Sequence, residues 1–116
     1  MQNVEFAHRL VQFTVNVVLL SRNHAKEYHL NPLFNQVIRS AGSIGANITE
    51  AHGANSRVAY GRYFNIALQS ANETKYWLTV LKELKVSVQR CDELLSEVVQ
   101  FIKILTASLK TLRSKA

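Results

Sequence analysis

The chain has few of the residues that staple or interrupt a fold. Its 116 residues include one cysteine, one proline and four glycines. Because a disulfide needs two cysteines, Cys91 forms none within the chain. We expect it to be a small buried hydrophobe in a reducing compartment, which favours a cytoplasmic location. The scarce proline and glycine residues mark the breaks between longer elements.

Several functional classes lack the pattern that they require. No apolar run reaches the eighteen or so residues that span a bilayer, and polar residues interrupt the first twenty positions. The four histidines show no metal-ligand spacing, and the paired Glu-x-x-His motifs of di-metal bundles are absent. Neither the cysteine nor any serine stands in a motif for nucleophilic catalysis, and none of the serines occupies a strained elbow. We therefore expect no membrane segment, metal, cofactor or small-molecule substrate, and predict that the protein is not an enzyme.

The residues that are present follow a helical period with three breaks. Asn31 is expected to cap a helix with Pro32 at its first position, Asn55 or Ser56 to cap the next, and Ser87 the last. The helices are therefore predicted at about 4–22, 32–52, 56–84 and 88–113, with a polar connection over 23–30. Because every predicted element is a helix, we predict an all-α fold in one domain over residues 1–116. Since short connections place successive helices side by side, we expect an antiparallel up-down-up-down four-helix bundle.

Polar side chains follow the second predicted helix beside its apolar stripe. Arg39, Ser43, Asn47 and Glu50 recur at three- and four-residue steps, and Arg39 is expected to pair with Glu73 of the third helix. A polar network between helices usually fixes which helices are neighbours, so we predict a structural role for these five residues. A ligand site is the alternative, and a bundle enzyme would need Arg39, Glu50 and Glu73 around an open cavity.

The chain carries more apolar material than one core needs. The residues expected to face inward are Ala7, Leu10, Val11, Thr14, Val17, Val18 and Ser21 in the first helix; Tyr60, Tyr63, Phe64, Ala67, Ala71, Thr74, Leu78, Leu81 and Leu84 in the third; and Cys91, Leu94, Leu95, Val98, Ile102, Leu105, Leu109 and Leu112 in the fourth. The surplus on the first and third helices indicates contact with another subunit. Gly42 and Gly45 each cost about 1 kcal/mol against alanine in a helix, which indicates close packing by another segment.

Basic residues give the chain a net charge of +6, which favours nucleic acid over a membrane surface as a polyanionic partner. The candidate nucleic-acid-binding residues are Lys103, Lys110 and Arg113 on one face of the fourth helix, with Lys75 and Lys82 on the third. The last two flank Tyr76 and Trp77. Cations beside exposed rings are typical of surfaces that bind single-stranded nucleic acid. A solvated lysine face and a subunit interface for the rings explain the same residues equally well.

Two segments resemble one bacterial family. Positions 39–50 match an R-x-A-x-S-I-x-x-N-I-x-E pattern, and the third helix matches at Tyr60, Arg62, Tyr63, Phe64, Ile66, Ala67, Leu68, Ser70, Glu73 and Leu78. These motifs are similar to those of four-helix bundle proteins encoded in intervening sequences of large-subunit ribosomal RNA genes. Ala51 departs from the usual glycine, and Gly61 replaces a larger residue, which is expected to loosen the start of the third helix.

The resemblance implies a left-handed bundle that assembles into a ring, typically a homopentamer. A related branch, the accessory variability determinant proteins of diversity-generating retroelements, forms basic pentamers that bind nucleic acid and a reverse transcriptase. Most intervening-sequence members have no established activity. The leading hypothesis is thus a non-enzymatic homo-oligomeric scaffold for structured RNA or an RNA–protein complex such as a reverse transcriptase. The alternative is a protein-interaction module with no nucleic-acid role, whose partner covers Tyr76 and Trp77.

Overall fold

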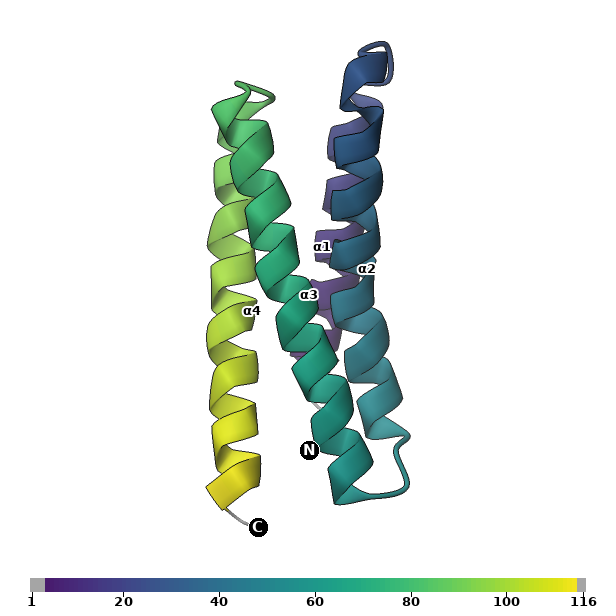
Figure 1. Cartoon of the computed structure of the whole chain (residues 1–116), viewed down its shortest axis with the longest axis vertical. Helices are drawn as coiled ribbons and strands as arrows, with labels where there is room; N and C mark the ends of the chain where they lie inside the picture. The colour runs from purple at the N-terminus through teal and green to yellow at the C-terminus, as the bar shows by residue number, and fades with distance from the viewer. Residues whose placement is uncertain (1–3, 115–116) are drawn as a thin grey trace.

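The computed structural model describes residues 4–114, and this part of the chain folds into four long helices without a strand. They are α1 (Val4–Arg22), α2 (Asn31–His52), α3 (Arg57–Glu83) and α4 (Val88–Ser114), with a short 3-10 turn, η1 (Tyr28–Leu30), before α2. Each helix runs back along the one before it (Figure 1), which gives a bundle of 49 × 22 × 20 Å. The predicted all-α four-helix bundle is confirmed, while its left-handed sense stays a prediction. None of the four described helices is long and apolar enough to cross a bilayer.

Capping rules predict the start of α3 correctly but not the start of α2. At α3 the Ser56 hydroxyl accepts a hydrogen bond from the Ala59 backbone N–H at 3.1 Å, as a capping side chain does. The predicted cap at Asn31 is wrong, because α2 begins at Asn31 itself and Leu30 holds the cap position without a side-chain bond. Leu30 is buried, so the η1 turn anchors the connection in the core and sets the start of α2.

The connection from α3 to α4 is a tight helix ending. Lys85 has a positive φ of 64°, and the Val86 N–H donates to the Leu81 carbonyl at 3.0 Å, while the Lys85 N–H donates to the Lys82 carbonyl at 2.9 Å. This pair of bonds is the Schellman arrangement, which usually has glycine at the position of Lys85. Ser87 precedes α4 as predicted, but its hydroxyl lies 2.8 Å from Nε2 of His24.

The core runs along the whole bundle and differs from the prediction at α1. Phe6, Phe13 and Leu20 are buried, although the spacing placed them outside the inward stripe, and Val11 is 62% exposed. The reason is aromatic packing against α4. The ring of Phe101, which is fully buried and was absent from the predicted core, lies 5.6 Å from Phe6 and 5.2 Å from Phe13 in edge-to-face contacts. Leu84, expected inside, is largely exposed.

Helices α1 and α4 meet along the least extensive seam of the bundle, and one ion pair bridges it. The Arg9 guanidinium donates to both carboxylate oxygens of Glu97, at 3.0 and 2.8 Å, and lies 5.4 Å from the centre of the Phe101 ring. These hydrogen bonds to Glu97 raise the pKa of Arg9. The pair is one-third exposed, so it orients the seam more than it stabilises the fold.

Candidate nucleic-acid interface

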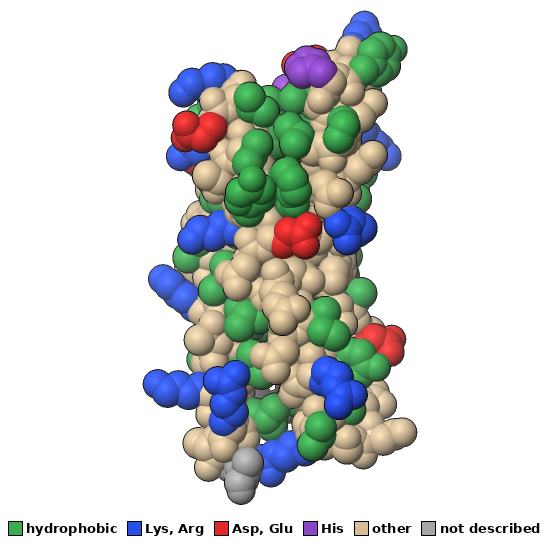
Figure 2. Space-filling view, in the orientation of Figure 1, with side chains coloured by type: hydrophobic (Ala, Val, Ile, Leu, Met, Phe, Trp, Pro, Cys, Tyr) green, Lys and Arg blue, Asp and Glu red, His purple; other side chains and the backbone are tan. Residues whose placement is uncertain are grey.

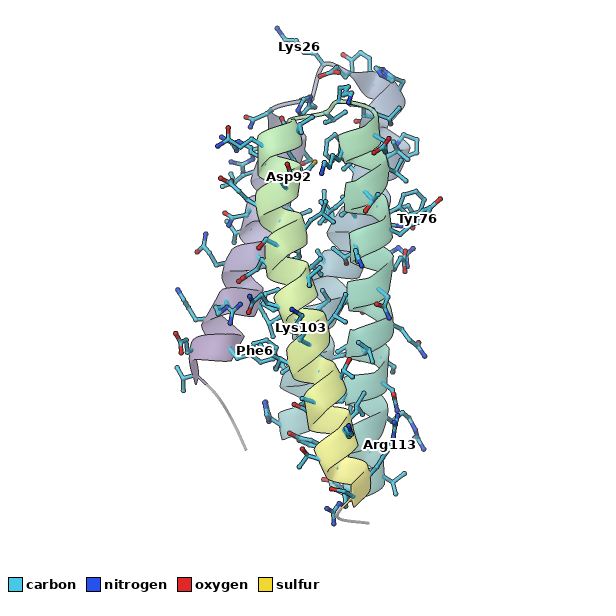
Figure 3. All side chains as sticks on the ribbon, turned by 90° about the vertical axis from the view of Figure 1, so that its left-hand side faces the viewer. Phe6, Lys26, Tyr76, Asp92, Lys103 and Arg113 are labelled. Carbon is cyan, nitrogen blue, oxygen red and sulfur yellow. The ribbon has the colours of Figure 1, made fainter. Side chains whose placement is uncertain are left out.

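The basic residues of α4 occupy its solvent-exposed side. Lys103, Lys110 and Arg113 are all exposed, and no acidic residue follows Glu97 in the sequence. Figure 3 shows Lys103 half-way along α4 and Arg113 near its C-terminal end. The predicted cationic face of the fourth helix therefore exists as a surface.

The two α3 lysines and their neighbouring rings are arranged differently from the prediction. Lys82 forms an ion pair with Asp92 at 2.6 Å, and this hydrogen bond raises the pKa of the lysine. Trp77 is half-buried, and its indole N–H donates to Glu73 at 3.1 Å. The only fully accessible members of the group are Lys75 and Tyr76, which is 60% exposed and touches Trp77 edge-on. The expected platform of two cations and two open rings is thus reduced to one of each.

A second basic group, which the sequence analysis missed, lies beside Arg113. Arg57 and Arg62 of α3 line a shallow groove of about 400 Å³ together with Arg113 of α4. The start of α3 meets the end of α4 because the two helices are antiparallel (Figure 1). Figure 2 shows Lys and Arg side chains gathered round this lower end of the molecule. The sequence analysis could have found this group from the predicted antiparallel arrangement, which places the start of the third predicted helix beside the end of the fourth.

The floor of the groove explains Gly61. This glycine is buried, and a Cβ added to it would lie 2.9 Å from Cδ2 of Leu112. The Leu112 side chain thus occupies the space that a larger residue would fill. The glycine thus admits a side chain of α4, while the expected loosening of the start of α3 stays a prediction.

The polar ladder of α2 is assembled in part. Asn47 donates to the hydroxyl of Ser43 at 3.0 Å, and Ser43 accepts from Ser70 of α3 at 2.8 Å. Arg39 lies 3.7 Å from Glu73, as expected, in a pair that is largely exposed. Glu50 is exposed on α2 and joins none of these residues by a hydrogen bond or ion pair within the described chain. The cluster of Arg39, Glu50 and Glu73 that a bundle enzyme would need does not form.

Two buried residues extend this network and were missed. Thr74 is fully buried, and its hydroxyl lies 2.8 Å from the Ser40 hydroxyl and 2.7 Å from the Ser70 carbonyl oxygen. Ser40 is also buried and donates to the Val37 carbonyl. Both lie on the apolar stripes of their helices, so their spacing alone does not distinguish them from apolar core residues. The network joins α2 to α3 through hydroxyl groups.

The close packing expected at Gly42 and Gly45 is not supplied by the described chain itself. A Cβ at Gly45 would lie 3.4 Å from Cβ of Leu10, and one at Gly42 would lie 3.9 Å from Cγ2 of Thr14. Both are ordinary van der Waals distances. The two glycines line an open groove of about 380 Å³ between α1 and α2, whose walls include Ala46 and the exposed side chains of Val11 and Val15.

Metal and thiol chemistry find no support among the described residues. No group of three His, Cys, Asp or Glu side chains in residues 4–114 is arranged to hold a metal ion. Cys91 is fully buried, its thiol donates to the Val86 carbonyl at 3.2 Å, and burial raises the pKa of the thiol. A raised pKa keeps the sulfur protonated and unreactive, which agrees with its predicted packing role.

Comparison with known proteins identifies the family of the chain. A family model described as 23S rRNA-intervening sequence protein matches residues 2–107. The chain belongs to the 23S rRNA-intervening sequence protein family. Among solved structures, this family member is similar to a protein of unknown function from the S23 ribosomal protein family of Bacteroides thetaiotaomicron VPI-5482. The two share 32% sequence identity with a TM-score of 0.83 over 90% of this chain and 97% of the other. No curated protein matches the intervening sequence protein described here.

Proposed function

We propose that the protein is a homo-oligomeric scaffold that binds structured RNA through the basic end of the bundle. The proposed interface consists of Lys103, Lys110 and Arg113 of α4 with Arg57 and Arg62 of α3. The observation that carries the proposal is the convergence of Arg57, Arg62 and Arg113 on one groove. Three arginines on one groove whose lining contains no acidic residue favour phosphate as a ligand, because each guanidinium presents several N–H donors to phosphate oxygens.

Assembly is part of the same proposal, with a pentameric ring as the expected form. The α1–α2 groove supports it, because Gly42 and Gly45 together weaken the helix by about 2 kcal/mol while the chain's own packing leaves room for a methyl group at each. A second copy packed in the groove would need that space and would cover Val11 and Val15. In a ring, the basic ends of successive subunits would add up to one extended positive surface.

The nature of the RNA also belongs to the proposal. The family name supports a role beside 23S ribosomal RNA, and an RNA–protein complex such as one with a reverse transcriptase is the other candidate of this class. The role proposed toward the RNA is binding, so no reaction is assigned to the RNA, and a cytoplasmic location suits this role. Of the lysines proposed from the sequence, Lys75 is accessible for such contacts, whereas Lys82 already neutralises Asp92.

Charge reversal tests the interface. The probe is a fluorescent stem-loop transcribed from 23S ribosomal RNA, and its anisotropy reports binding at low and raised salt. The triple variant Lys103→Glu, Lys110→Glu and Arg113→Glu is expected to weaken binding at least tenfold at about 100 mM salt, and to flatten the salt dependence, because fewer counterions are released.

The matched control reverses three charges at the other end of the bundle, in Arg22→Glu, Lys26→Glu and Lys85→Glu. Each reversal removes two charge units, so both triple variants go from a net charge of +6 to 0. Binding lost equally in both would show general attraction to a cationic protein and contradict the proposed interface. Unchanged affinity in the α4 triple would do the same.

The alternative, a protein-interaction module, is favoured by one observation. Hydrophobic side chains gather on the upper part of the face shown in Figure 2. Independently of that view, Tyr76 and Leu84 are largely exposed. Under this alternative, a partner protein would cover these two side chains and RNA would not bind. A chain that binds no RNA at low salt, but whose Tyr76 is shielded from solvent on addition of the host's proteins, would favour this second function.

A further inference from the structure

Three side chains form a hydrogen-bonded relay at the end of the bundle opposite the basic groove. The Ser87 hydroxyl lies 2.8 Å from Nε2 of His24, and Nδ1 of His24 lies 2.6 Å from the carboxylate of Glu27. Ser87 comes from the α3–α4 connection, while His24 and Glu27 come from the connection after α1. The His24 ring stacks on Phe34 with the ring centres 5.8 Å apart, which fixes its orientation.

The hydrogen bonds assign the proton positions. An ionised carboxylate only accepts, so Nδ1 of His24 carries the proton that points to Glu27. In the neutral ring Nε2 is then an acceptor, and the Ser87 hydroxyl donates to it. The order of hydroxyl, imidazole and carboxylate is the one in which a serine is activated for attack on a carbonyl carbon.

The backbone around Ser87 adds two further features. Ser87 has a positive φ of 43°, which is a strained conformation for a serine. It directly precedes α4, and the first helical bond is donated by Cys91 to the Ser87 carbonyl at 3.0 Å. The amide N–H groups of residues 88–90 therefore have no acceptor in the helix, and they follow Ser87 directly in the chain. Such groups stabilise an oxyanion.

A groove gives a substrate access to this serine. It lies between α1 and α4, has a volume of about 950 Å³, and is lined by Ser87, Val88 and Gln89 at one end. Its walls include Leu19 and Leu94, with Arg90 and Glu93 among the polar residues. The groove therefore offers both apolar and polar surface next to the hydroxyl.

We propose that Ser87 is an activated nucleophile that hydrolyses carboxylic esters bound in the α1–α4 groove. Its oxygen forms a bond to the ester carbonyl carbon while the proton passes to Nε2 of His24, and the carbonyl oxygen becomes an oxyanion beside residues 88–90. The intermediate then expels the alkoxide, which takes the proton from His24. Water attacks the acyl-serine by the same route, releases the acid and restores Ser87. Glu27 is a positioning residue that holds the His24 tautomer.

Two probes test the proposal on the full chain: covalent labelling by a fluorophosphonate, and hydrolysis of p-nitrophenyl acetate. Ser87→Gly removes the hydroxyl and suits the positive φ, so the variant keeps the backbone. His24→Gln removes the base. Ser87→Gly should lose the label altogether, because the labelled oxygen is gone. His24→Gln should be labelled about a hundredfold more slowly, in line with the usual contribution of a general base. The matched controls Ser96→Ala and His29→Gln change exposed residues outside the relay and should react like the parent.

Free imidazole separates chemistry from structure. Added to His24→Ala, it should restore part of the fluorophosphonate labelling of Ser87, which a merely structural histidine would not allow. Labelling is the readout here because imidazole alone hydrolyses p-nitrophenyl acetate. The proposal is overturned if the label maps to another residue. It is also overturned if Ser87→Gly, shown by circular dichroism to be folded, hydrolyses the ester as fast as the parent. The latter result would mean that surface histidines account for the reaction. The relay would then serve only to tie the two connections together.

Discussion

Single residues decide how each helix of this bundle ends, and capping chemistry predicts only part of it. Ser56 was predictable because its hydroxyl bonds a backbone N–H three residues along the same chain. Asn31 was not, because a buried leucine in the preceding turn sets the start of α2. The Ser87 hydroxyl contacts a histidine 63 positions away in sequence. Local rules therefore hold where the partner is local, and fail where the partner comes from another connection.

Lys85 offers a test at this scale. Its φ of 64° is costly for a residue with a Cβ, and glycine is the usual occupant of this position in the Schellman arrangement. We expect Lys85→Gly to raise the free energy of unfolding by about 1 kcal/mol, measured by urea denaturation. The control is Gln100→Gly on the exposed side of α4, which should lower stability by about the same amount. If both changes destabilise, the positive φ carries no strain.

At the scale of helices, spacing predicted which segments are helical better than which face each helix buries. The four helices end within a residue or so of their predicted bounds. Helix α1 has apolar residues around most of its perimeter, so its spacing could not tell that Phe6 and Phe13 face inward. Their inward orientation depends on contact with Phe101 of α4, which lies near the other end of the chain. Core facing thus needed three-dimensional information that no single helix contains.

The pairing of α2 with α3 makes a prediction about coupled hydroxyl groups. Thr74→Val leaves the buried Ser40 hydroxyl with the Val37 carbonyl at 3.3 Å as its remaining partner, which should cost about 1–2 kcal/mol. Ser40→Ala in the same chain removes the hydroxyl that has lost its Thr74 partner. We therefore expect the double variant to be more stable than the sum of the two single changes predicts, by about 1 kcal/mol in urea denaturation. Ser40→Ala combined with Thr49→Val, an exposed threonine of α2, is the control and should be additive.

Additivity in both pairs would mean that Ser40 and Thr74 do not depend on one another. The hydroxyl pair would then contribute nothing to the choice of α3 as the neighbour of α2. Coupling in the first pair alone would support the structural role predicted for the polar ladder. It would also move the centre of that network from the exposed Arg39 and the half-buried Glu73 to the buried residues.

At the scale of the molecule, the bundle separates its features between its ends. The basic groove of Arg57, Arg62 and Arg113 lies at one end of the bundle. The relay of Ser87, His24 and Glu27 lies at the other end. From sequence, the α4 half of the basic surface was predictable because its residues share one helix face. The α3 half required the antiparallel register of two helices. For the apolar groove between α1 and α2, the only indication in the sequence was the pair of glycines inside a predicted helix.

That groove carries the last prediction, which concerns assembly. Ala46 is exposed and lines the groove, so Ala46→Glu places a charge there without disturbing the core. If a second copy packs on the groove, burying an unpaired carboxylate costs several kcal/mol, and the oligomer should dissociate at micromolar concentration. The mass by light scattering should then fall to that of one chain, 13.1 kDa, while the circular dichroism stays helical.

Thr79→Glu on the exposed side of α3 makes the same charge change away from the groove and should leave assembly intact. An assembly that survives Ala46→Glu would show that the groove is not the contact between copies. A parent chain that is already monomeric would remove the oligomeric part of the proposed function. Only dissociation by Ala46→Glu alone ties Gly42 and Gly45 to assembly, because it would show that the space beside them is filled by another subunit.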